Sequence, residues 1–352
     1  MAIQRSRTAV AAALALATTL ALTACSKPGP AGGPGATDAS TVGPPVTLNL
    51  VGYSVAEAAN AAAAQEWAKT NEGSNVTFRT SYGASGDQSR AVLNGLAADV
   101  VHFSVESDIT RLVPDLVDPR WNSGPTKGII SSSLVVFVVR PGNPKNIHGW
   151  DDLIKPGIGI VTPNPASSGS ARWNALAAWG QVIAAGGTED QAKDFVTKLY
   201  ANAVALPASG RDATTAFLGG TGDVYLTYEN EAILAKQSGE DLDWVYPDTT
   251  LLIENPAAVL KTADPKAQAY LNFVLTPAGQ RAFALKGYRP VISGVDTSGI
   301  PGVPDPTNPF PTPKKLLTIA NDFGGDWAAL SKKFFDADTG IVVQIIAGTG
   351  KS

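Results

Sequence analysis

The chain has 352 residues, a formal net charge of −4 at pH 7 and a pI of about 5.3. Such a mildly acidic chain lacks the basic surface on which nucleic-acid binding depends, so we expect no nucleic-acid partner. One cysteine and two histidines cannot form an internal disulfide or a convincing zinc site, and we therefore expect neither a metal nor a cofactor.

The first 24 residues have the features of an export signal. A short positive segment around Arg5 is followed by an apolar stretch, residues 10–22, that is too short to span a membrane comfortably. The stretch leads into the letters LTAC, which resemble a bacterial lipobox, so we expect cleavage before Cys25 and lipidation of that cysteine. The alternative is an ordinary secretory signal in which Cys25 is incidental.

Residues 25–45 are rich in Pro, Gly, Ser, Thr and Ala and contain almost no bulky side chain. Such a segment cannot bury enough apolar area to order itself, and we interpret it as a disordered tether between the lipid and the folded part. The rest of the sequence contains no apolar run of membrane-spanning length. We therefore expect a protein of the cell envelope that is lipid-anchored to the outer face of the cytoplasmic membrane.

From Val46 onward, β-rich runs alternate with amphipathic segments, which predicts parallel sheets covered by helices. The expected strands are 47–51, 76–80, 98–103, 134–139, 204–206, 223–228, 242–246 and 257–260. The expected helices begin after Ser54, Ser85, Thr188 and Ser209, or cover about 171–186 and 265–283. Two of these starts, Ser54 with Glu57 and Ser85 with Gln88, have the spacing of a capping box.

The segment 162–180 (TPNPASSGSARWNALAAWG) is the most informative part of the sequence. It predicts a strand end, a Pro-rich turn, a cluster of small residues and a helix. The first turn of a helix has N–H groups without internal partners, and small residues let an oxyanion approach them. The serines before Gly169 add hydroxyl donors. An anion site at this helix start is one interpretation, and an ordinary serine-capped helix is the other.

Serine recurs at or near four predicted strand-to-helix junctions, at positions 54, 85, 168 and 209. In open parallel sheets, ligands bind beyond the carboxyl ends of the strands, where such junctions lie. Each serine taken alone is explained by the general preference for serine at a helix N-cap. Together they favour a shared binding site.

Five further stretches give the chain a family resemblance. They are the segment 143–180, YGASGDQSRAVLNGLAADVV from Tyr82, YENEAIL from Tyr228, GYRP from Gly287 and LTIANDFGG from Leu317. With them, the chain from about 46 to 340 resembles the sulfate-binding proteins of ABC-type importers, in the family that also holds thiosulfate- and molybdate-binding proteins.

The resemblance implies an α/β fold of the two-lobed periplasmic-binding-protein type (type II), with mixed, mostly parallel sheets flanked by helices. A hinge with two crossovers, near 131–134 and 246–252, would join the lobes. Lobe one would be 46–132 plus 251–345, and lobe two 133–250. The Pro-rich segment 301–315 would wrap the surface as an arm.

The resemblance also implies where the anion is held. The residues at the family's sulfate-binding positions are Ser85, Ser168, Gly169, Ser170, Gly210 and Tyr228. Ser54, Arg172 and Arg211 would stand behind these residues and orient the turns. For the two arginines, the alternative is plain surface charge near a helix start.

The chain departs from the family pattern at four positions. Tyr228 stands where the family has a tryptophan, and Ser170 stands where it has a glycine. Asp87 follows the serine-glycine turn, where the family is often basic, and Ser54 follows Tyr53, where the family tends to have an aspartate. An acid at position 87 opposes a bound anion unless it points away.

The implied function is that of a monomeric receptor, not an enzyme, which captures sulfate and delivers it to ABC permease subunits. The alternative ligand is thiosulfate, molybdate or another tetrahedral oxyanion. A sulfatase or phosphatase would need a metal cluster or a nucleophile with a base, for which no motif is present. A purely structural surface lipoprotein is a further alternative, which predicts no ligand-linked closure.

Sulfate has no proton at neutral pH, so a site made only of donors satisfies it fully. We therefore hypothesise that the site hydroxyls donate and that no carboxylate reaches the anion. Asp212, Glu229 and Glu231 are the nearby acids that would contradict this hypothesis if they faced inward. His102 ends a strand near the site, and its role is open between the core and the surroundings of the anion.

Overall fold

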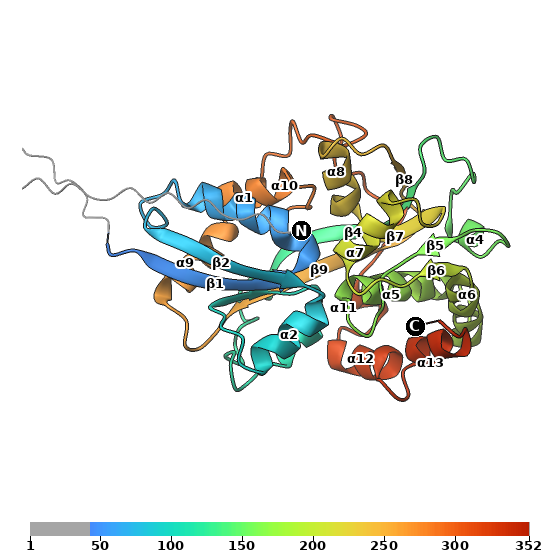
Figure 1. Ribbon diagram of the computed structural model, residues 1–352, viewed down its shortest axis with the longest axis horizontal. Helices are drawn as coiled ribbons and strands as arrows, with labels where there is room; N and C mark the ends of the chain where they lie inside the picture. The colour runs from blue at the N-terminus through green and yellow to red at the C-terminus, as the bar shows by residue number, and fades with distance from the viewer. Residues whose placement is uncertain (1–42, 352) are drawn as a thin grey trace, which may run out of the picture. The chain divides into compact units, whose positions relative to one another are not determined.

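The computed structural model describes residues 43–351 (Figure 1). The predicted export signal, Cys25 and nearly all of the predicted tether lie outside the described residues. No helix between 43 and 351 is both long and apolar enough to cross a membrane.

One mixed sheet system contains all the strands described. They are β1 (Val46–Tyr53), β2 (Val76–Gly83), β3 (Val100–His102), β4 (Ile129–Val139), β5 (Ile160–Val161), β6 (Ala203–Ala205), β7 (Val224–Tyr228), β8 (Asp243–Val245), β9 (Thr249–Val259) and β10 (Lys315–Leu317). The strand order is β2-β1-β3-β9-β4-β7-β5-β6, with β8 beside β4 and β10 beside β9. Parallel pairs lie at both ends of this order, because β1 pairs with β2 and β3, and β5 pairs with β6 and β7.

The two long strands β4 and β9 connect the two ends of the sheet. They run antiparallel to each other from Ile129 to Leu134 and from Leu252 to Pro256. The apolar run from Leu134 to Val139 then enters the second lobe. Every side chain of this run is at most 1% exposed. The β4 part of this pairing includes the crossover expected near 131–134, whereas the β9 part begins at Leu252, where the crossover expected near 246–252 ends. The mixed, two-lobed fold is as the sequence predicts. The lobe boundaries at 132/133 and 250/251 stay a prediction.

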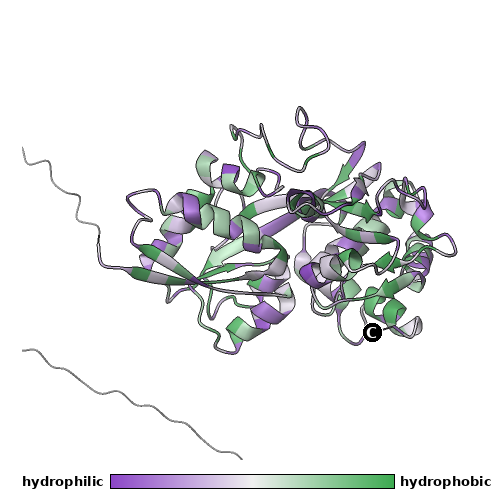
Figure 2. Cartoon of the chain, turned by 45° about the horizontal axis from the view of Figure 1, so that its top comes forward, coloured by the Kyte–Doolittle hydropathy of each residue, from purple (hydrophilic) through white to green (hydrophobic). Residues whose placement is uncertain are grey.

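Helices cover the sheet on both sides (Figure 1). They are η1 (Ser54–Ala56), α1 (Glu57–Trp67), α2 (Ser85–Leu93), α3 (Glu106–Thr110), α4 (Trp150–Leu153), α5 (Gly169–Ala184), α6 (Glu189–Ala201), α7 (Gly210–Leu218), α8 (Glu229–Gln237), α9 (Pro265–Val274), α10 (Pro277–Ala284), α11 (Ile319–Asp322), α12 (Trp327–Phe335) and α13 (Ile341–Gly348). Figure 2 shows hydrophobic residues along the strands and hydrophilic ones on exposed helix faces and loops. This pattern is the one expected of a sheet buried between helices.

The C-terminal helices α12 and α13 pack on α5 and α6 (Figure 1). The rings of Trp179 and Phe334 lie 5.0 Å apart, and those of Trp173 and Trp327 lie 4.8 Å apart, both edge to face. These contacts join the end of the chain to helices that follow β5, in the second lobe. The segment 251–345 was expected in lobe one, but its C-terminal helix α12 packs on α5 of the predicted lobe two. The assignment of this segment stays a prediction.

Three local expectations differ from the structure. Ser54 does not cap α1, because it begins the short helix η1, and the cap position of α1 falls on Ala56. Ser85 is the first residue of α2 instead of its cap, and the Gln88 amide accepts a hydrogen bond from Ser81. The helix expected over 265–283 is divided into α9 and α10, because Thr276 caps a new helix that starts with Pro277.

The start of α6 allows a direct test of a helix cap. The Thr188 hydroxyl accepts from the N–H of Gln191, and the Gln191 side chain accepts from the N–H of Thr188. We expect Thr188→Ala to lower the free energy of unfolding by about 1 kcal/mol in denaturant titrations. Thr197→Ala, in the middle of the same helix, is the matched control and should change it by less than about 0.5 kcal/mol. Equal effects of the two substitutions would contradict the capping role.

Candidate functional site

The starts of α5 and α7 lie close to each other, to η1 and to Ser104. A Cβ added to Gly169, at the start of α5, would overlap the Ser104 side chain. One added to Gly210, at the start of α7, would lie 2.8 Å from the Val55 Cγ2 of η1 and 3.6 Å from the Ser170 Oγ. Glycine at positions 169 and 210 therefore lets these helix starts approach closely. The positive dipole ends of α5 and α7 lie here. Some first-turn N–H groups have protein partners, because Gly86 of α2 donates to the Ser167 carbonyl and Asp212 of α7 donates to the Ser209 hydroxyl.

Ser104, which sequence reasoning missed, lies at the centre of this arrangement. Its N–H donates to the Ser85 Oγ at 2.9 Å, and its own Oγ lies 2.6 Å from the Tyr228 hydroxyl. Its carbonyl accepts from the Trp173 indole N–H at 2.8 Å. The structure thus brings the predicted residues of α2, α5 and β7 together around one serine. A lone serine after a strand carries no signal that could have identified it.

The Ser85 hydroxyl is already engaged by the protein. It donates to the Asp108 Oδ2 at 2.6 Å and accepts from the N–H of Ser104. Asp108 lies on α3, is buried, and also pairs with Arg111 at 2.9 Å. The hydroxyl proton of Ser85 is therefore directed to a carboxylate, and what α2 offers an anion is the backbone N–H of its first turn. Asp108 was not foreseen, because no local pattern links it to Ser85.

The other predicted donors at the start of α5 are buried. Ser168 is 2% exposed and forms the N-cap without a side-chain capping bond, and Ser170 is 3% exposed. The Ser170 Oγ has no hydrogen-bond partner within the described chain. A buried hydroxyl without a partner has a cost in stability that an occupant of the site would remove.

Tyr228 is fully buried at the end of β7. Burial raises the pKa of its phenol well above the usual value, so the hydroxyl keeps its proton. It contacts Ser104 and lies 3.5 Å from the Asn255 Nδ2. Tyr228 stands at the position where the resemblance implies a tryptophan, and its hydroxyl contacts Ser104, beside the start of α5.

The three nearby acids are paired with protein groups. Glu229 accepts two hydrogen bonds from the Arg289 guanidinium, at 2.6 and 2.8 Å. Glu231 accepts from Thr214 at 2.7 Å and forms an ion pair with Arg211 at 3.0 Å.

Asp212 caps α7 together with Ser209, whose hydroxyl donates to the Asp212 carboxylate at 2.7 Å. Asp87, another of the departures from the family pattern, pairs with Arg90, and its side chain is 54% exposed. The acids at these positions therefore have cationic or hydroxyl partners of their own.

Arg172, Arg211 and Ser54 were expected to orient the turns around the site. Arg172 is 8% exposed, and its Nε donates to the Pro165 carbonyl at 3.1 Å, which supports the turn before α5. Burial lowers the pKa of its guanidinium, and the nearby Asp108 opposes this shift. Arg211 supports α7 through Glu231. Ser54 is 9% exposed at the start of η1 and does not act as a cap.

A buried polar network continues from the site into the hinge strands. The Asn255 amide of β9 accepts from Tyr53 at 2.9 Å and from Ser131 at 3.3 Å, and donates to the Ser104 carbonyl at 2.9 Å. Ser131 also contacts the Nε2 of His102 at 3.2 Å. His102 is therefore a core residue of this network, and complete burial lowers the pKa of its imidazole to about 3.

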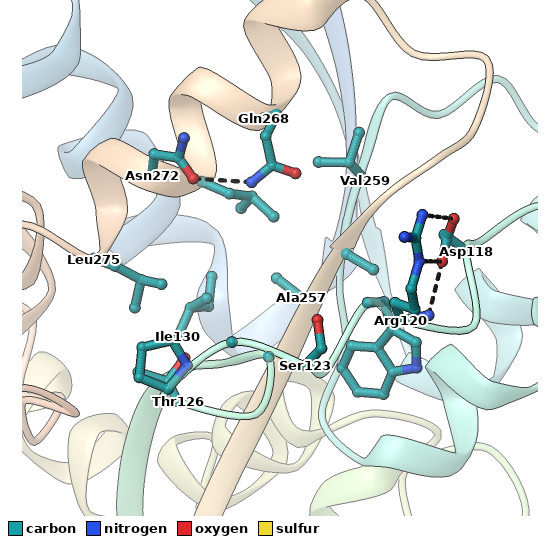
Figure 3. Close-up of a pocket in the computed structure, with 16 residues that line it drawn as sticks. Asp118, Arg120, Ser123, Thr126, Ile130, Ala257, Val259, Gln268, Asn272 and Leu275 are labelled. Carbon is teal, nitrogen blue, oxygen red and sulfur yellow. Dashed lines mark hydrogen bonds and ion pairs between the residues drawn. The ribbon is translucent and has the colours of Figure 1, made fainter.

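A separate pocket of about 490 Å³ opens beside β9 and α9 (Figure 3). Its Arg120 pairs with Asp118, which lowers the pKa of that carboxyl to about 2. Its Gln268 donates to Asn272 at 2.9 Å. Because these polar groups satisfy one another and the lining includes none of the predicted anion-binding residues, we do not assign a ligand to this pocket. Among residues 43–351, no group of three His, Cys, Asp or Glu side chains could hold a metal ion.

The pKa of His102 predicts a pH dependence of stability. Its folded-state pKa lies below the ordinary value of 6.5, so the unfolded chain binds the proton more tightly. The stabilisation from neutral His102 is complete above about pH 6.5 and declines as the pH falls toward 3. In His102→Gln we expect the loss of stability between pH 7 and 4.5 to be smaller by roughly 2 kcal/mol.

Nuclear magnetic resonance gives a second check that does not depend on the folding of this variant. The wild-type His102 imidazole should stay neutral between pH 8 and 5. A His102 titration with a midpoint near 6.5 would contradict its burial in the network.

Known proteins resemble this chain in sequence and in fold. Residues 48–289 match the family described as bacterial extracellular solute-binding protein. A sulfate-binding protein of Synechococcus elongatus is 42% identical over 337 residues, which cover 92% of each chain. The solved structure of the sulfate-binding protein SubI from Mycobacterium tuberculosis is 43% identical, with a TM-score of 0.76, and the match covers 83% of this chain and 100% of that one.

A thiosulfate-binding protein of Pseudomonas aeruginosa is also similar, at 36% identity over 296 residues, which cover 80% of this chain and 85% of that one. The fold, the convergent helix starts and these similarities lead to one conclusion: the chain belongs to the bacterial extracellular solute-binding proteins, within the group of sulfate-binding proteins of ABC importers.

Proposed function

We propose that this chain is an extracytoplasmic receptor that captures sulfate between its two lobes and delivers it to an ABC permease. The observation that carries the proposal is the buried Ser170 hydroxyl, which has no partner within residues 43–351 although it lies among converging helix starts. An oxyanion would supply the missing acceptor. The donors are expected to be Ser168, Gly169, Ser170, Gly210 and Tyr228, together with the first-turn N–H of Ser85.

Selectivity for sulfate over phosphate follows from the inventory of donors and acceptors. Hydrogen phosphate carries a proton that needs an acceptor, and a buried unpaired group costs about 1–3 kcal/mol. Asp108, Asp212, Glu229 and Glu231 each have protein partners, which supports a site that faces the anion with donors only. The Ser85 hydroxyl is the exception to the expected set, because its proton is directed to Asp108.

Contacts between the lobes support capture by closure. The N–H of Gly86 on α2 donates to the Ser167 carbonyl before α5 at 3.0 Å. Trp173 of α5 likewise donates to Ser104. An anion with ligands on both sides favours the conformation in which these contacts form, because it binds that conformation more tightly.

We propose binding without catalysis. An activated serine needs a free base within hydrogen-bond reach. The carboxylate that Ser85 contacts, that of Asp108, is paired with Arg111, and His102 contacts Asn60 and Ser131. Delivery to permease subunits as a monomer completes the proposed role.

Thiosulfate is the second candidate ligand, and one observation favours it. Tyr228 contacts Ser104 at 2.6 Å, and if Tyr228 donates in that bond the site has one donor fewer. The terminal sulfur of thiosulfate is a weaker acceptor than an oxygen and would tolerate the loss. Molybdate is a tetrahedral oxyanion as well and belongs in the same titration series.

The central test is titration calorimetry of the purified protein at fixed ionic strength with sulfate, thiosulfate, molybdate and phosphate. We expect one-to-one sulfate binding and phosphate binding that is weaker by at least about tenfold, because hydrogen phosphate leaves one buried group unpaired. Ser168→Ala should weaken sulfate binding by more than about tenfold, because a hydrogen bond to a charged oxygen is lost. Ser123→Ala, in the separate pocket beside β9, is the control and should leave the affinity unchanged. Unchanged affinity in Ser168→Ala would remove Ser168 from the site.

We also propose that Cys25 is lipidated and anchors the receptor to the outer face of the cytoplasmic membrane. Cys25→Ser should abolish incorporation of labelled palmitate in cells and move the protein from the membrane fraction to the soluble fraction. A labelled, membrane-bound Cys25→Ser variant would be incompatible with this anchor.

A further inference from the structure

The Tyr228 hydroxyl has two polar neighbours in the protein. Ser104 lies 2.6 Å away and Asn255 lies 3.5 Å away, and both residues are at most 1% exposed. A phenol has one proton and can accept two hydrogen bonds. What Tyr228 presents to a ligand is therefore decided by which of these neighbours donate to it.

The role of Asn255 is fixed by its surroundings. Its Nδ2 also faces the Ser104 carbonyl at 2.9 Å, and a carbonyl can only accept. Its Oδ1 faces the hydroxyls of Tyr53 and Ser131, which can donate. The amide therefore has one favourable orientation, in which the Nδ2 donates to Tyr228 and occupies one of its acceptor positions.

The Ser104 hydroxyl permits two arrangements. If Tyr228 donates to Ser104, the phenol has no proton left to donate to the anion, and its oxygen faces the anion with a lone pair. If Ser104 donates to Tyr228, both acceptor positions of the phenol are filled and its proton is free. A fully deprotonated anion such as sulfate accepts only, so its binding selects the second arrangement.

We propose that Ser104 is a positioning residue for specificity: it donates to Tyr228 and thereby turns that phenol into a donor toward the bound anion. The inference rests on the proposed function, because it assumes an oxyanion among the helix starts. Burial raises the pKa of Tyr228, which supports a proton that stays on the phenol.

Ser104 is held firmly enough for this role. Its N–H donates to Ser85, and its carbonyl accepts from both Trp173 and Asn255. These three bonds involve its backbone and persist in Ser104→Ala, so we expect that variant to fold. Its side chain faces Gly169, whose missing Cβ leaves room for the hydroxyl.

Loss of the Ser104 hydroxyl has a specific consequence for phosphate. Tyr228 would regain a free acceptor position in the site. The P–OH proton of hydrogen phosphate, unpaired in the wild type, could then be accepted by the phenol. The substitution should therefore reduce discrimination as well as affinity, whereas general damage to the fold would weaken both anions together.

The test is calorimetry with sulfate and with phosphate on the wild type, Ser104→Ala, Tyr228→Phe and the double variant. We expect Ser104→Ala to weaken sulfate binding by about fivefold and to lower the sulfate-to-phosphate preference by at least about tenfold. The double variant should bind sulfate no more weakly than Tyr228→Phe, because Ser104 acts through Tyr228. Tyr200→Phe, a buried phenol on α6, is the matched control and should be silent. Thermal unfolding without anion checks that each variant is folded.

Three results would overturn the inference: sulfate affinity in Ser104→Ala within twofold of the wild type, equal weakening of both anions, or additive losses in the double variant. Each of these requires that the wild type binds sulfate. If the wild type does not bind sulfate, the proposed function itself fails, so the two failures are distinguishable.

Discussion

The close approach of α5 to Ser104 is the constraint on which the site depends. Gly169 begins α5 directly against the Ser104 side chain, at a distance that no Cβ would permit. This approach places the first turn of α5 beside the start of α2, which Ser104 contacts through Ser85. With the predicted lobe boundaries, α2 belongs to one lobe and α5 to the other, and we propose that this contact forms when the lobes close.

The acidic groups around the site are paired with protein groups before any ligand binds. Asp108 is paired with Ser85 and Arg111, and Glu229 with Arg289. The pairs neutralise charges that would repel an anion, and they occupy acceptors that would stabilise a protonated one. A net charge of −4 is thus compatible with anion binding, because helix starts and oriented hydroxyls provide a local positive potential.

The sequence predicted the fold and the helix start at 168–170 well, because both depend on local pattern: apolar runs make the strands, and small residues mark the turn before α5. Contacts between distant residues could not be predicted in this way. Asp108, Ser104 and Asn255 have no motif, and their partners lie far away in the chain. The proton of Ser85 was assigned to the anion for this reason, whereas the structure directs it to Asp108. The capping boxes at Ser54 and Ser85 were wrong, because the cap positions fall on Ala56 for α1 and on Ala84 for α2.

The central claim is that an anion joins helix starts from two lobes and so couples binding to closure. Small-angle X-ray scattering tests it directly through the radius of gyration of the protein with and without saturating sulfate. The account predicts a larger radius for the sulfate-free protein and a decrease on addition of sulfate, with no decrease on addition of chloride at equal ionic strength. An unchanged radius at a concentration where calorimetry shows full occupancy would contradict it.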